Sequence, residues 1–148
     1  MTRLLLRRAA WLLLAVALPA AATTQAASEA VADADALLAD GKLEAAGERL
    51  SGALEEDPDS ALLHLRLGGV QLLRQHHSDA VESFQTAIGL GAEGAPAFIG
   101  LGIAYLHMGR YGSATAALEE AARLDPGKRS DIEALLSSLD SRLPAPSD

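Results

Sequence analysis

The chain has 148 residues, of which 49% are apolar, enough for one small domain or a short array of repeats. It contains no cysteine, which excludes disulfide bonds, thiol nucleophiles and thiolate metal sites. With 12 basic and 20 acidic residues the formal net charge is −8, so the overall charge does not attract nucleic acid.

Residues 1–22 have the pattern of a secretory signal peptide: a basic start with three arginines, an apolar stretch and small residues at positions 20–22. The apolar stretch is shorter than the roughly 20 residues of a membrane span. Cleavage after Ala22 predicts an exported protein, periplasmic or secreted. It would leave nine basic and twenty acidic residues, a net charge of −11. An uncleaved N-terminal anchor is the alternative.

Residues 23–27 are expected to form a flexible tail, and a helical hairpin is predicted over residues 27–60. Gly41 ends its first helix, because a left-handed C-cap costs glycine nothing. The second helix stops before Pro58, since proline disfavours helical conformation in the preceding residue.

A second hairpin is predicted over residues 61–94. Its first helix is apolar almost all round, so we expect it to be covered on most sides. Ser78 is predicted to cap the second helix. Glycines at 89, 91 and 94 end that helix in place of a proline and predict a more flexible joint.

A third hairpin is predicted over residues 95–128, with Gly102 providing the small side chain where its two helices approach. Ser130 and Glu133 have the spacing of a capping box, which predicts a final helix over residues 129–143. Residues 144–148 are expected to form a polar tail.

Small and large residues recur in step, 34 residues apart, through all three hairpins. The recurring sets are Ala34, Gly68 and Gly102; Ala46, Ala80 and Ala114; Leu50, Phe84 and Leu118; and Ala53, Ala87 and Ala121. This pattern resembles the tetratricopeptide repeat family, whose unit is a helix–turn–helix. The resemblance predicts an all-α protein: an α-solenoid of three such repeats and a C-terminal capping helix, preceded by the signal peptide.

In that family the first helices of successive repeats line a concave groove that binds extended or helical peptides. Transferred to this chain, the groove residues are Val31, Asp35, Leu38, Leu62, Leu65, Gly69, Leu72, Leu73, Ile99, Ile103, Leu106 and His107. Members that bind chaperones hold a terminal carboxylate with lysine, arginine and asparagine. The corresponding places here are mainly apolar, so we do not expect a carboxylate clamp.

The sequence leaves the occupant of this leucine-rich groove open. It is covered by the chain's own tail, by the N-terminal segment or by a second subunit, or it binds an apolar segment of another protein.

No catalytic, cofactor-binding or metal-binding residues are predicted. His76 and His77 are interpreted as solvated turn residues, and the pairs Glu55–Glu56 and Glu119–Glu120 as solvated convex surfaces. The protein is therefore not expected to be an enzyme.

The sequence predicts a scaffold or adaptor of the bacterial cell envelope that binds a protein or peptide through the groove. It predicts no nucleic-acid partner, and membrane contact only through an uncleaved N-terminal segment. The alternative is a self-assembling homo-oligomer or a non-catalytic accessory subunit of an envelope complex.

Overall fold

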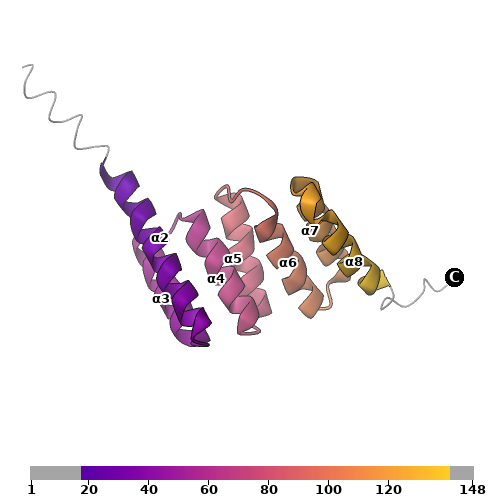
Figure 1. Ribbon diagram of the computed structural model, residues 1–148, viewed down its shortest axis with the longest axis horizontal. Helices are drawn as coiled ribbons and strands as arrows, with labels where there is room; N and C mark the ends of the chain where they lie inside the picture. Colours follow the sequence, from indigo (N-terminus) through magenta and orange to yellow (C-terminus); the bar gives the residue numbers. More distant parts are fainter. Residues whose placement is uncertain (1–17, 141–148) are drawn as a thin grey trace, which may run out of the picture.

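A computed structural model describes residues 18–140 as a row of helices (Figure 1). The predictions for residues 1–17 and 141–148 lie outside the described residues. The helices are α2 (Leu18–Ala39), α3 (Leu43–Glu56), α4 (Ala61–Leu73), α5 (His77–Gly89), α6 (Ala95–His107), α7 (Tyr111–Leu124), a 3₁₀ turn η1 (Pro126–Lys128) and α8 (Arg129–Asp140).

The helices pair as three stacked hairpins, α2–α3, α4–α5 and α6–α7, with α8 packed on α7 (Figure 1). Each helix contacts the next along the chain, and the first helices of neighbouring hairpins also touch, α2 with α4 and α4 with α6. Within residues 18–140 there is no strand. The predicted all-α solenoid is confirmed.

The residues that recur every 34 positions form the interior of this stack. Ala46, Ala80 and Ala114 have no exposed surface, and Leu50 and Leu118 are equally buried. A Cβ atom at Gly102 would lie 2.7 Å from Leu118 Cγ. The small residues therefore let the two helices of a hairpin approach closely, as predicted.

Phe84 connects two hairpins. A Cβ atom at Gly68, in the same hairpin, would lie 2.9 Å from the Phe84 ring, and one at Gly100, in the next hairpin, would lie 2.2 Å from it. Both glycines are buried, and the ring itself is nearly so. The ring thus fills space that two missing side chains leave on α4 and α6.

The turn within each hairpin has one geometry, repeated three times. Gly41, Gln75 and Gly109 occupy equivalent positions with φ angles of 73°, 63° and 70°. The amide that follows each of them donates to the carbonyl five residues earlier, at 2.8–2.9 Å, as in a Schellman motif. The prediction for Gly41 is confirmed, whereas Gln75 holds a conformation that glycine adopts more easily.

Two predicted helix caps are wrong. Ser78 is not the cap of α5, because the turn places the helix start at His77, equivalent to Leu43 and Tyr111. Ser130 is not a cap either: Arg129 already begins α8, after the η1 turn in which the Asp125 carboxylate accepts a hydrogen bond from the Gly127 amide at 3.0 Å.

The predicted flexible tail at residues 23–27 is also wrong, because α2 begins at Leu18 and includes these residues. The helix as a whole is rich in alanine, the strongest helix former, with ten alanines among its 22 residues. Gln25 Nε2 donates to Glu29 Oε1 at 3.1 Å, one turn along the helix. Ala27 is already buried in the core cluster between α2, α3 and α4, which we call the first core cluster.

Candidate binding groove

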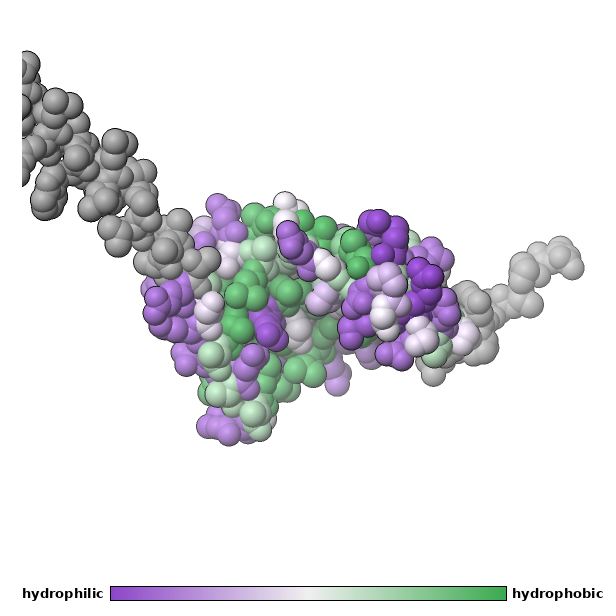
Figure 2. All heavy atoms as spheres, turned by 45° about the horizontal axis from the view of Figure 1, so that its top comes forward, coloured by the Kyte–Doolittle hydropathy of each residue, from purple (hydrophilic) through white to green (hydrophobic). Residues whose placement is uncertain are grey.

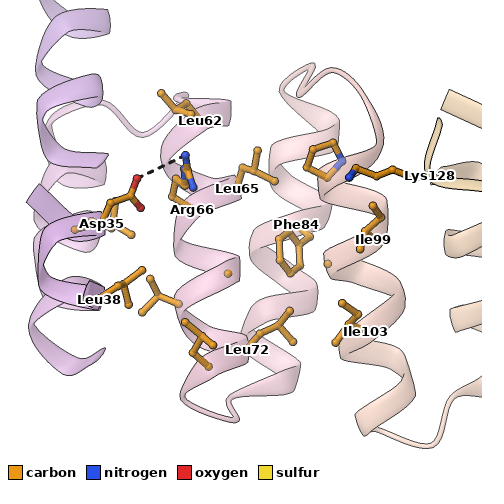
Figure 3. A pocket seen from close by; sticks show the side chains of 17 residues that line it. Asp35, Leu38, Leu62, Leu65, Arg66, Leu72, Phe84, Ile99, Ile103 and Lys128 are labelled. Atoms are coloured by element: carbon orange, nitrogen blue, oxygen red, sulfur yellow. Dashed lines mark ion pairs between the residues drawn. The ribbon is translucent and has the colours of Figure 1, made fainter. Parts of the chain in front are cut away.

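A cavity of about 630 Å³ lies along the first helices of the hairpins, between α2, α4 and α6 (Figure 3). Most of its surface is apolar carbon. The 17 residues that line it are Ala34, Asp35, Leu38, Leu50, Leu62, Leu65, Arg66, Gly69, Val70, Leu72, Leu73, Phe84, Pro96, Ile99, Gly100, Ile103 and Lys128. We call this cavity the groove.

The structure places nine of the twelve predicted residues at the groove. They are Asp35, Leu38, Leu62, Leu65, Gly69, Leu72, Leu73, Ile99 and Ile103. On α4, Leu62, Leu65, Gly69 and Leu72 follow one another at three or four positions, and Leu73 lies four after Gly69, so all five share one face of the helix. That they bind a partner stays a prediction.

Val31, Leu106 and His107 do not line the groove, so their assignment to it is corrected. Val31 is only 8% exposed and belongs to the core between α2, α3 and α4. Leu106 packs against the core clusters on both sides of α6. His107, the last residue of α6, stacks on His77 with ring centroids 4.5 Å apart.

The leucines of α4 that line the groove are not covered by the protein's own helices. Leu62 is 41% exposed and Leu73 is 58% exposed, while Leu63 on the opposite side is fully buried. The prediction that α4 is covered on most sides is therefore wrong for the side that faces the groove. Figure 2 shows hydrophobic residues gathered in the middle of the visible face, with hydrophilic residues towards both ends.

Three side chains in the groove are polar, and all three are charged: Asp35, Arg66 and Lys128. Arg66 forms an ion pair with Asp35 across α2 and α4, with 3.7 Å between Nη2 and Oδ2 (Figure 3). Within residues 18–140, Lys128 has no ion-pair partner, and in Figure 3 it lies on the α6 side of the groove.

Sequence reasoning missed both cations. Arg66 could have been found, because it lies four residues after Leu62 and three before Gly69 on the same helical face. Lys128 gave no such signal. It belongs to the η1 turn, and only the packing of the third hairpin brings it to the groove.

In the second and third hairpins the acidic residues lie on the second helix. Neither α4 nor α6 contains an aspartate or a glutamate, whereas α5 and α7 contain four. In the first hairpin both helices are acidic, with three such residues on α2 and four on α3. Glu55, Glu56 and Glu119 are exposed, in keeping with a solvated surface. Glu120 accepts hydrogen bonds from Arg123, which lower the pKa of that carboxyl below its usual value.

None of the four histidines lines the groove. His76 is exposed, as predicted, but His77 is half-buried and stacks on His107, which corrects its interpretation as a solvated turn residue. Within residues 18–140, no three histidine, aspartate or glutamate side chains lie close enough together to hold a metal ion.

Comparison with known families agrees with this geometry. Residues 37–88 match the tetratricopeptide repeat, and residues 95–128 match it again, so that more than half of the chain is covered. The chain belongs to the tetratricopeptide repeat family. This family typically acts in protein–protein interaction rather than in catalysis. A comparison with curated protein sequences yields no significant match.

Solved tetratricopeptide repeat structures share the fold. The second TPR of Spaghetti (RPAP3), bound to the HSP90 peptide SRMEEVD, is 25% identical with a TM-score of 0.65, over 68% of this chain and 94% of that one. YrrB, a TPR protein with an unusual peptide-binding site, is 25% identical with a TM-score of 0.61, and the match covers 71% of this chain and 58% of that one. The second TPR domain of human RPAP3, in complex with the HSP70 peptide SGPTIEEVD, is 24% identical with a TM-score of 0.73. The match covers 80% of this chain and 98% of that one.

Proposed function

We propose that this protein is a non-catalytic adaptor that holds an apolar segment of another protein in the groove between α2, α4 and α6. The observation that carries the proposal is an open, leucine-lined groove in a chain that is otherwise strongly acidic. Two tetratricopeptide repeat neighbours, one solved with a bound HSP90 peptide and one described as having a peptide-binding site, support the same kind of function.

The leucines of the groove are the main source of free energy for binding an apolar partner. Burying one leucine side chain stabilises a complex by about 1.5–3 kcal/mol, and Leu62, Leu65, Leu72 and Leu73 all retain exposed surface in the groove. Four fully buried leucines would contribute about 6–12 kcal/mol, a range that includes the roughly 8 kcal/mol of a micromolar complex before the entropic cost of association is subtracted. Left open, the same surface would favour aggregation.

We further propose that the protein is exported and acts in the bacterial cell envelope. The signal-peptide pattern of residues 1–22 supports this location. Cleavage after Ala22 would fall within α2 and before Ala27, which belongs to the first core cluster. The fold of the hairpins would therefore survive the cleavage. None of the helices within residues 18–140 is long and apolar enough to cross a membrane.

Site-specific photo-crosslinking in the cells that produce the protein tests this function. We expect a photoreactive side chain at Leu65, in the groove, to crosslink a partner that mass spectrometry can identify. The same group at Glu82, exposed on α5 outside the groove, is the matched control and should not. Replacing both Leu65 and Leu72 with serine should abolish the crosslink from a third groove position, Ile99. Equal crosslinking from Leu65 and Glu82 would contradict the proposal.

Self-assembly through the groove is the competing function, and the exposed Leu62 and Leu73 favour it equally. Light scattering across a range of concentrations separates the two. A mass that stays monomeric excludes self-assembly, whereas a dimer that the Leu65→Ser/Leu72→Ser variant dissociates would replace the adaptor proposal.

A further inference from the structure

The polar groups that line the groove decide which backbone conformation a bound segment can have. The groove is lined by helices, whose main-chain amides and carbonyls are paired within the helices themselves. Asp35, Arg66 and Lys128 supply its only polar side chains, and Asp35 is already paired with Arg66. An extended segment would bury main-chain groups without partners. A helical segment carries its own hydrogen bonds into the groove.

The two ends of the groove differ in charge. Lys128 and the Arg66–Asp35 ion pair lie towards the end where α4 and α6 begin, so two cations and one carboxylate leave a net positive charge there. Leu38, Leu72 and Ile103 lie towards the other end (Figure 3). Helix N-termini carry a partial positive charge, so the starts of α4 and α6 add to the two cations. The end with Leu72 and Ile103 lies near the C-terminal halves of the same helices, whose partial charge is negative.

From this polarity we propose that the occupant is an amphipathic helix of a partner protein that runs antiparallel to α4 and carries acidic residues near its C-terminal end. The inference rests on the proposed adaptor function. The acidic end lies against Arg66 and Lys128, and the apolar stripe faces Leu65, Leu72, Ile99 and Ile103. The partner helix's own dipole, negative at its C-terminus, favours the same direction.

The length of the groove sets the length of this partner helix. Leu62 and Leu73, at its two ends on α4, are eleven residues apart, about 17 Å along a helix axis. About three turns of partner helix therefore fill the groove. The N-terminal segment 1–22 of the chain itself fits poorly as the occupant, because its charged residues are three arginines.

Disulfide crosslinking measures the direction, because the chain contains no cysteine of its own. The matched variants are Leu62→Cys, at the cationic end, and Leu73→Cys, at the opposite end; both positions are exposed. The probe is a synthetic amphipathic helix of about 15 residues with leucines on one face, glutamates near its C-terminus and a C-terminal cysteine. We expect it to crosslink with Leu62→Cys about tenfold faster than with Leu73→Cys. Equal or reversed rates would overturn the proposal.

Binding affinities test the role of charge separately. A second peptide has the same composition but carries its glutamates near the N-terminus, and we expect it to bind about tenfold more weakly at low salt. The variant Arg66→Gln/Lys128→Gln should remove this difference. Lys42→Gln/Arg123→Gln, which removes two exposed cations outside the groove, should keep it. A difference that persists in the first variant would overturn the assignment to Arg66 and Lys128.

A proline-containing peptide that cannot form a helix separates this inference from the proposed function. If it binds as tightly as the helical probe, and Leu65→Ser/Leu72→Ser abolishes its binding, the adaptor function stands and the helical occupant is wrong. If no peptide binds and no partner crosslinks to Leu65 in cells, both proposals fail.

Discussion

The hairpins α4–α5 and α6–α7 occupy equivalent positions 34 residues apart, yet they close their interiors differently. In α6–α7 the side chain of Leu118 fills the space above Gly102 and belongs to the core cluster that includes Ile132 of α8. In α4–α5 the larger Phe84 fills the space above Gly68 and also reaches Gly100 on the next hairpin. One substitution in a repeated position thus joins two hairpins and contributes part of the surface of the groove.

The difference shows that one position of the repeat can hold a large apolar side chain in every hairpin and still make different contacts in each. Its consequence depends on the residue that faces it from the next repeat. Position 100 is glycine where the equivalent residue in the previous hairpin is Arg66, which points to the groove instead. The Phe84 ring therefore has room only because α6 lacks a side chain at Gly100.

The largest expected effect comes from filling that space. Gly100→Ala would place a Cβ atom 2.2 Å from the Phe84 ring, and we expect the free energy of unfolding to fall by about 2–3 kcal/mol in urea denaturation. Adding Phe84→Leu, the residue type that the third hairpin uses, should restore part of this loss. Gly52→Ala on α3, where no atom lies within 4 Å, is the control and should be neutral or stabilising. An equal loss in both variants would remove the special role of Phe84.

The turns of the two hairpins provide a test with opposite signs. Gln75 adopts the left-handed conformation at φ 63° that Gly109 adopts at φ 70°. Gln75→Gly should raise the free energy of unfolding by about 0.5–1 kcal/mol, and Gly109→Gln should lower it by about 1–2 kcal/mol. Thermal unfolding of the two variants measures both. If the two substitutions change stability in the same direction, the turns are not equivalent.

The helix starts differ by a smaller amount. The Ser60 hydroxyl accepts from the Leu63 amide at 3.5 Å and caps α4, whereas α6 begins after Gly94 without a side-chain cap. Because that hydrogen bond is long, Ser60→Ala should cost only about 0.5 kcal/mol. Ser78→Ala, inside α5, should leave the midpoint of urea unfolding unchanged. A larger loss for Ser78→Ala would reinstate it as a cap.

In the first hairpin, removal of residues 1–22 is expected to leave the stability of the protein almost unchanged. Among the residues whose burial is described, the core contacts of α2 begin at Ala27. A chain that starts at Thr23 should therefore have the melting temperature of the full chain within about 2 °C by circular dichroism. A lower melting temperature would show that residues before Thr23 support the array, and it would argue against cleavage after Ala22.

Much of the fold could be predicted because its signals are local. Ala46, Ala80 and Ala114 recur at one spacing, and glycine or proline marks most of the helix ends, so the hairpins and their order follow from the sequence. The caps of α5 and α8 were assigned to the wrong residues because the turn before each helix, and not the nearby serine, fixes its first residue. The helical conformation of residues 23–27 was missed because alanine-rich sequence extends a helix that tertiary contacts hold from Ala27 onwards.

The groove was predicted less completely than the fold. The resemblance to the family placed nine residues on it, but Val31 and Leu106 face the core, because a helix in a solenoid has neighbours on more than one side. The contacts of His77 with His107, and of Phe84 with Gly100, join residues 30 and 16 positions apart on different helices. No local pattern carries such pairs.

The sequence by itself determined the helical hairpins, their period and the apolar face of α4, because each depends on residues within a few turns of one another. Only the tertiary structure decided that this face stays open, that Phe84 links two hairpins, and that Lys128 joins Arg66 at one end of the groove. These features depend on how neighbouring hairpins are placed in space. That placement follows from the fit of side chains between repeats, which the spacing within a repeat does not specify.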